Sequence, residues 1–156
     1  MEELNAKIME VNNNMRKQRN RSEHAVRVLD TMSEDEEPEP VQLLKTGKSL
    51  LKECKASEAK HIFEQSLKAM QSSRAFLQEP WKVERKARRG IGAACVQLKM
   101  FEEAEENYMQ VVKLCETNIP EGADRPELAD AYGALADMYT DWGKLEKAAE
   151  TYDKMI

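Results

Sequence analysis

Apolar and small residues recur every three or four positions along almost all of the 156-residue chain. This spacing is typical of amphipathic helices, whereas half-buried strands alternate every second residue. Interruptions of the pattern predict seven helices, at about residues 3–32, 41–54, 57–77, 80–98, 101–118, 126–142 and 145–156. We therefore expect an all-α fold.

The first segment, residues 1–32, carries an unbroken seam in which spacings of four and three residues alternate. Its members are Leu4, Ile8, Val11, Met15, Gln18, Ser22, Ala25, Leu29 and Met32. A heptad seam of this length predicts a coiled coil, made with a partner or with a second copy of the chain. The alternative is an amphipathic helix that packs on its own domain. Residues 33–40, "SEDEEPEP", hold five acidic residues and two prolines and predict an acidic linker.

From residue 41 onward one pattern occurs three times: a small residue, an alanine twelve positions later, and an aromatic residue four positions after that. The three sets are Gly47, Ala59 and Phe63; Gly92, Ala104 and Tyr108; and Ala136, Ala148 and Tyr152. A period of 45 and then 44 residues on a helical background predicts three helical hairpins. The small residues should let the two helices of a hairpin approach closely, and the aromatic residue should fill the space where they diverge.

This pattern resembles that of tetratricopeptide repeats, although each copy is longer than the usual period of about 34 residues. The resemblance implies a right-handed α-solenoid over residues 41–156, with repeats at about 41–79, 80–124 and 125–156. In such solenoids the first helix of each hairpin lines a concave groove that binds other polypeptides.

Charge is distributed unevenly along the predicted solenoid. The whole chain has a net charge of −5, but residues 41–99 hold thirteen Lys and Arg against five Asp and Glu, and residues 100–156 hold five against fourteen. By registering the three copies, we expect the groove to be basic at one end and acidic at the other. The charged residues expected to contact a partner are Lys45, Lys48, Lys52, Lys86, Arg89, Asp130, Asp137 and Asp141. Such a field would orient a protein partner and raise its association rate.

The sequence offers no catalytic constellation and no expected cofactor or metal. His24 and His61 have no second ligand at metal-binding spacing, and the three cysteines are widely separated, which favours small core residues in a reducing compartment. "RKARRG", residues 85–90, lacks interleaved aromatic residues, so we do not expect nucleic-acid binding. The sequence contains no run of about 18 apolar residues, so we predict no membrane span. No targeting peptide is visible.

Two stretches extend the resemblance to a particular family: "ERKARRGIGAACVQLKMFEEAEENY" and "LADAYGALADMYTDWGKLEKAAETYDKMI". They are similar to the tetratricopeptide region of the chloroplast Fluorescent in blue light proteins of plants and algae. The resemblance covers residues 41–156 and is sharpest over 129–156. It implies a thylakoid-associated, non-catalytic repressor of chlorophyll and tetrapyrrole synthesis that binds glutamyl-tRNA reductase through its tetratricopeptide domain.

Two other interpretations remain open. One is a scaffold of the kinesin light chain kind, whose long repeats also follow a heptad coil. The other is a structural subunit of a larger assembly, in which a neighbouring protein covers the outer face of residues 145–156.

Overall fold

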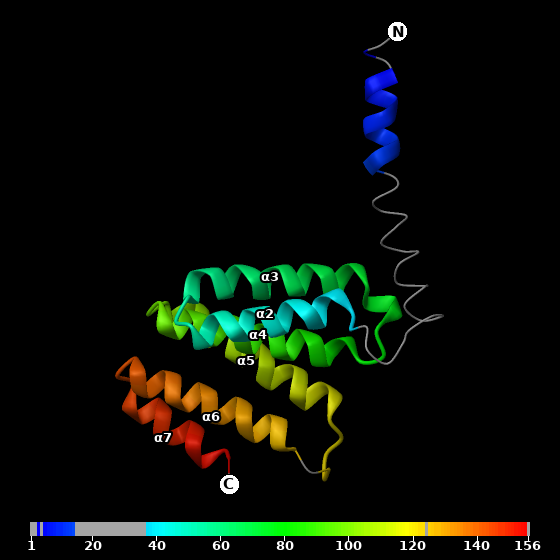
Figure 1. Ribbon diagram of the computed structural model, residues 1–156. Coiled ribbons are helices and arrows are strands. Elements are labelled where there is room, and N and C mark those ends of the chain that lie inside the picture. Colours follow the sequence, from blue (N-terminus) through cyan, green and yellow to red (C-terminus); the bar gives the residue numbers. More distant parts are fainter. Residues whose placement is uncertain (1–2, 4, 15–36, 124, 156) are drawn as a thin grey trace.

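The computed structural model describes residues 3, 5–14, 37–123 and 125–155, and the described residues of the first two ranges are helical (Figure 1). The later helices are α2 (Glu39–Lys52), α3 (Ala56–Ser72), the 3₁₀ turn η1 (Arg74–Phe76), α4 (Pro80–Gln97), α5 (Phe101–Asn118), α6 (Pro126–Asp141) and α7 (Leu145–Asp153). No strand occurs in the part of the chain that the structure describes. The expected all-α fold is confirmed.

The helices from α2 onward form three antiparallel hairpins, α2–α3, α4–α5 and α6–α7, stacked in chain order (Figure 1). The second helix of each hairpin packs on the first helix of the next, so that α3 contacts α4 and α5 contacts α6. The first helices also meet one another, because α4 contacts both α2 and α6. This is the expected solenoid of three helical repeats.

Each hairpin turns through the same hydrogen-bonded motif. Cys54, Lys99 and Gly143 have positive φ values of 61°, 59° and 83° and follow the first helix of their hairpins. The next residue donates its backbone N–H to the carbonyl five residues earlier, as in Lys144 to Tyr139 at 2.8 Å. This Schellman motif satisfies carbonyl groups that the helix end leaves without partners. Only the third hairpin has glycine at the left-handed position, where a side chain is disfavoured.

The aromatic residue of the repeat lies against glycine. A Cβ atom added at Gly47 would lie 2.7 Å from Cε1 of Phe63, and one added at Gly92 would lie 2.5 Å from Cε1 of Tyr108. The Phe63 ring also faces Gly90 of the next hairpin. The glycines therefore make room for an aromatic ring as well as for close helices. The contact of the ring with these glycines is a feature that the sequence pattern did not predict, and its role as a filler between diverging helices stays a prediction.

The remaining repeat positions are buried with one exception. Ala59, Ala104, Ala136 and Ala148 are all almost fully buried, as the close helix packing requires. Tyr152 is 41% exposed, in contrast to its equivalents in the first two hairpins.

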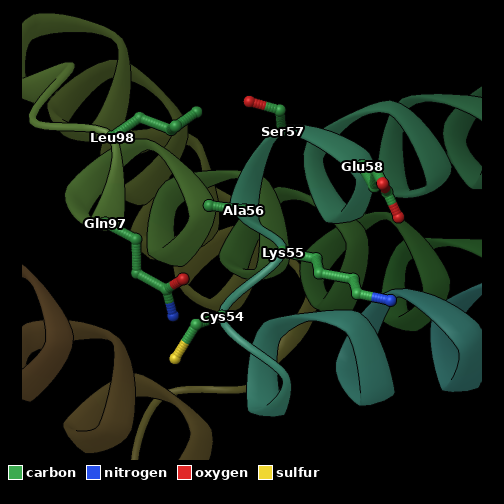
Figure 2. Close-up of a pocket in the computed structure, with 7 residues that line it drawn as sticks. All are labelled: Cys54, Lys55, Ala56, Ser57, Glu58, Gln97 and Leu98. Carbon is green, nitrogen blue, oxygen red and sulfur yellow. The ribbon is translucent and has the colours of Figure 1, made fainter.

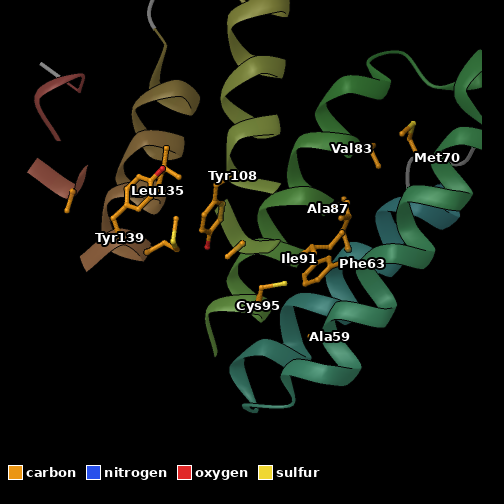
Figure 3. Close-up of a cluster of buried hydrophobic side chains, with 14 residues drawn as sticks. Ala59, Phe63, Met70, Val83, Ala87, Ile91, Cys95, Tyr108, Leu135 and Tyr139 are labelled. Atoms are coloured by element: carbon orange, nitrogen blue, oxygen red, sulfur yellow. The ribbon is translucent and has the colours of Figure 1, made fainter. Parts of the chain in front are cut away.

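One apolar cluster runs through all six helices from α2 to α7. Figure 3 shows its centre, where Phe63, Ala87 and Ile91 meet between α3 and α4. Cys95 belongs to this cluster and Cys115 to a second one between α5 and α6, so both are core residues. Cys54 is exposed at the first turn, and the expectation that it is a core residue is wrong.

Several helix boundaries differ from the predicted ones by one to five residues, and α7 ends at Asp153 where the prediction extends to residue 156. The predicted helix at 57–77 ends at Ser72 and is followed by η1. Helix α2 begins at Glu39, inside the predicted linker, and Pro40 in its first turn is buried and accepts a hydrogen bond of 2.8 Å from the Ser66 hydroxyl. The linker is therefore shorter at its C-terminal end than expected.

The predicted coiled coil is described only in part. Every described residue of 3–14 is exposed, including the seam residues Ile8 and Val11. The rest of the seam, residues 15–32, lies outside the described residues, and so do residues 33–36 of the linker. The coiled coil stays a prediction. Among the described helices, none is both long enough and apolar enough to cross a membrane.

Candidate partner-binding face

The first helices α2, α4 and α6 lie side by side, and their outward side chains form one surface, which we name the first-helix face. All eight charged residues expected to contact a partner lie on these three helices. They are Lys45, Lys48 and Lys52 on α2, Lys86 and Arg89 on α4, and Asp130, Asp137 and Asp141 on α6. Each is exposed except Arg89, which is partly buried.

Arg89 and Asp130 form a bidentate ion pair that joins α4 to α6. Nε and Nη2 of Arg89 donate to the two carboxylate oxygens of Asp130 at 2.6 and 3.0 Å. Both side chains remain more than a third exposed, so the pair contributes modestly to stability despite its favourable geometry. The charge pattern of the sequence predicts these residues at opposite poles of the groove, whereas the structure places them in contact where the poles meet.

Tyr108 of α5 is buried, and its ring lies against Gly92 of α4. Burial raises the pKa of its phenol to about 12, and the charges of Arg89, Asp130 and Asp137 act on the same group, with Arg89 opposing the shift. The phenol therefore stays neutral at physiological pH. Sequence reasoning assigns Tyr108 only to repeat packing.

Asp137 accepts a hydrogen bond from the hydroxyl of Tyr152, which joins α6 to α7. This hydrogen bond is the largest cause of the raised pKa of Tyr152. At the other end of the face, Lys45 pairs with Glu37 at 2.5 Å. Five of the predicted contact residues have no ion-pair partner within the described residues: Lys48, Lys52, Lys86, Asp137 and Asp141.

An aromatic group that sequence reasoning missed holds the third hairpin on the second. The ring of Trp142 stacks on Phe101, with centroids 5.6 Å apart, and on Tyr139 at 6.4 Å. The ammonium of Lys144 lies 3.6 Å from the Trp142 centroid. The Tyr139 hydroxyl donates to Glu105 at 2.6 Å, and burial together with this hydrogen bond raises the pKa of Tyr139. The recurrence of large aromatic residues near the turn could have indicated this group.

A surface hollow of about 600 Å³ lies at the turn between α2 and α3, next to the end of α4. Figure 2 shows its lining residues, Cys54, Lys55, Ala56, Ser57, Glu58, Gln97 and Leu98. The hollow lies at the turns and does not form part of the first-helix face. In the described part of the chain, no group of three His, Cys, Asp or Glu side chains could hold a metal ion.

Stacked helical hairpins with small and aromatic residues at matched positions define a tetratricopeptide-repeat protein, a class that binds other proteins. The family described as "Tetratricopeptide repeat" matches residues 84–155. The curated "Protein FLUORESCENT IN BLUE LIGHT, chloroplastic" of Arabidopsis thaliana is 29% identical over 167 residues, which cover 100% of this chain and 50% of that protein. The chain thus spans about half the length of this relative.

A solved structure gives the same assignment. The crystal structure of the TPR domain of Arabidopsis FLU matches with 31% identity and a TM-score of 0.62, over 74% of this chain and 90% of that domain. The chain belongs to the Fluorescent in blue light family of tetratricopeptide-repeat proteins. The resemblance drawn from the two sequence stretches is confirmed.

Proposed function

We propose that this chain is a non-catalytic adaptor of the chloroplast that binds glutamyl-tRNA reductase through its first-helix face and thereby restrains tetrapyrrole synthesis. Membership of the family and the chloroplast relative support the compartment and the adaptor role. The reductase as partner, the repressor role and the thylakoid association follow from the family resemblance. Self-association through residues 1–32 belongs to the same proposal.

One observation supports the use of the first-helix face in particular. Lys48, Lys52 and Lys86 form a cationic group on adjacent first helices, and no described carboxylate pairs with them. Unpaired surface cations are available to an acidic segment of a partner without first breaking an internal ion pair. They would act mainly on orientation and association rate.

The test is a double charge reversal at this cationic group. Lys48→Glu/Lys86→Glu should weaken binding to purified glutamyl-tRNA reductase by at least about tenfold, equivalent to about 1.4 kcal/mol, in titration calorimetry at low salt. The effect should shrink as salt is added, because exposed charges are screened. Arg89 is left unchanged in this variant because its reversal would also break the pair with Asp130.

A matched control carries the same change in net charge away from the face. Lys68→Glu/Lys113→Glu alters exposed lysines on α3 and α5, the second helices of their hairpins. It should bind the reductase like the unaltered chain, and both variants should keep the same circular dichroism and melting temperature. Equal binding by the two double variants would exclude the first-helix face as the contact surface.

A further inference from the structure

The three first helices are not joined to one another in the same way. Helix α4 meets α2 along a longer stretch than it meets α6. The ring of Phe63 lies between α2 and α4, in close contact with both Gly47 and Gly90. One ring therefore joins α2, α3 and α4 through contacts that leave no space for an added Cβ atom. Apolar packing fixes this first junction, between the first and second hairpins, and screening by salt does not weaken it.

The second junction, between the second and third hairpins, lacks such a shared ring. The residue of α6 that corresponds to Gly90 is Ala134. Its Cβ atom excludes a ring from the position that Phe63 takes on Gly90. Tyr108, the equivalent of Phe63, makes its close contact with Gly92 of its own hairpin. The packing that fixes α2 to α4 is therefore not repeated between α4 and α6.

An ion pair joins α4 to α6 instead. Nε and Nη2 of Arg89 donate to the two carboxylate oxygens of Asp130 at 2.6 and 3.0 Å. Among the described side chains, no other hydrogen bond joins these two helices. Arg89 is 41% exposed and Asp130 is 47% exposed, so salt screens the attraction between them. A bidentate pair fixes the distance and orientation of the groups it joins, but this one does so only while it stays closed.

The third hairpin is held on its other side by contacts of a different kind. Val112 and Cys115 of α5 form an apolar cluster with Ala131 of α6. At the opposite end of the same interface, the ring of Trp142 stacks on Phe101 with centroids 5.6 Å apart. Helix α6 is thus fixed to α5 near both of its ends. This line of contact forms an axis, and rotation of the third hairpin about it changes the spacing of α6 from α4.

We propose that the Arg89–Asp130 pair is a salt-sensitive latch, which sets the spacing of α4 and α6 and so the width of the first-helix face. When the pair opens, the third hairpin turns about its contact with α5. The acidic residues of α6 then move relative to the lysines of α2 and α4, while the first two hairpins keep their arrangement. The latch is a property of the chain itself and does not depend on the partner proposed above.

The test measures one distance across each junction by double electron–electron resonance. Spin labels at Lys86→Cys and Glu150→Cys span the second junction, from α4 to α7. Labels at Lys48→Cys and Lys113→Cys span the first junction in the same way, from α2 to α5. All four residues are exposed, and none forms an ion pair with a described residue. Cys54→Ser leaves only the two buried native thiols.

Arg89→Gln should broaden the distance distribution across the second junction. The fraction of a second distance should rise about two- to fivefold, the range that one exposed ion pair provides. About 1 M salt, which shortens the Debye length to about 3 Å, should have the same effect on the chain with the intact pair. The first junction should change under neither condition. Lys45→Gln is the matched control, because it breaks the ion pair with Glu37 on the same face without separating two first helices.

A swapped pair completes the test. Arg89→Asp/Asp130→Arg should restore the narrow distribution, because it keeps an ion pair between α4 and α6. A second junction that changes neither in Arg89→Gln nor in high salt would overturn the proposal. Equal broadening at both junctions, or a swapped pair that leaves the second junction broad, would also overturn it. Because no partner is present, the outcome is independent of what Lys48→Glu/Lys86→Glu does to binding of the reductase.

Discussion

The Phe63 ring provides the most direct test of the repeat packing, through the substitution Gly90→Ala. In a helix interior, alanine is favoured over glycine by up to about 1 kcal/mol, so propensity alone predicts stabilisation. The structure predicts the opposite. The added methyl group would lie 2.4–2.5 Å from three atoms of the ring, closer than real contacts permit.

The ring has no free direction in which to move. On its other side, a Cβ atom at Gly47 would lie 2.7 Å from the same ring, so Phe63 is held between α2 and α4. Overpacking of a confined site costs about 1–3 kcal/mol. If the overpacking costs about 3 kcal/mol and the helix propensity of alanine returns about 1 kcal/mol, the free energy of unfolding falls by about 2 kcal/mol. For a domain of this size, that loss lowers the melting temperature by about 4–8 °C.

The assay is urea unfolding followed by circular dichroism, with Gly133→Ala as the matched control. Gly133 also lies within a helix, but its added Cβ atom would be 3.6 Å from Cε of Met155, an ordinary contact. This control should gain about 0.5–1 kcal/mol. In a double-mutant cycle, Phe63→Leu should remove much of the cost of Gly90→Ala, because the smaller side chain leaves room. Stabilisation by Gly90→Ala equal to that of the control would refute this account of the packing.

Three further predictions follow from the turns and the buried phenols and thiols. Lys99→Gly should raise the free energy of unfolding by about 1 kcal/mol, because Lys99 has a left-handed backbone conformation that glycine adopts without a steric penalty. Lys99→Ala should change the free energy of unfolding little in the same urea assay. Burial raises the pKa of Tyr108 to about 12, above the value of about 10 in the unfolded chain, so the folded state holds this proton more tightly. Stability should therefore be lost as the pH rises from about 10 to 12, by up to roughly 3 kcal/mol from this residue, and Tyr108→Phe should flatten the dependence in melts across that range. In a titration of the thiols of the native protein, the exposed Cys54 should react rapidly. Cys95 and Cys115 should react only on unfolding, because both are buried and burial raises the pKa of Cys95 to about 11. Rapid reaction of all three thiols would contradict this burial.

Most of the fold could be predicted because it depends on local periodicity. The three hairpins follow from a pattern repeated at 45 and 44 residues, and α4, α5 and α6 begin at the predicted positions. The break after Ser72 could not be foreseen, because residues 73–77 have no proline or glycine and continue the helical pattern. The left-handed Cys54 and Lys99 were also hidden, since only Gly143 reveals this conformation by its residue type.

The helices that carry the candidate face could be predicted, but the ion pair between its residues could not. Registering the repeats places all eight charged residues on α2, α4 and α6. The contact between Arg89 and Asp130 depends on how far α6 is displaced along α4, and that displacement comes from tertiary packing. The burial of Pro40 has the same origin, because Ser66, its hydrogen-bond partner, is 26 residues away in the chain.

The Arg89–Asp130 pair changes how the charge of the face acts on a partner. Opposite charges at the junction of α4 and α6 largely compensate each other at distances beyond the pair itself. The field that reaches an approaching protein then comes mainly from Lys48, Lys52 and Lys86 on one side and Asp137 and Asp141 on the other. Two separated poles define a direction, so we expect an acidic segment of the partner to lie over α2 and a basic segment over α6. Neutralising the pair together, as Arg89→Gln/Asp130→Asn, should therefore alter partner affinity less than reversing Lys48 alone, although it changes two residues instead of one.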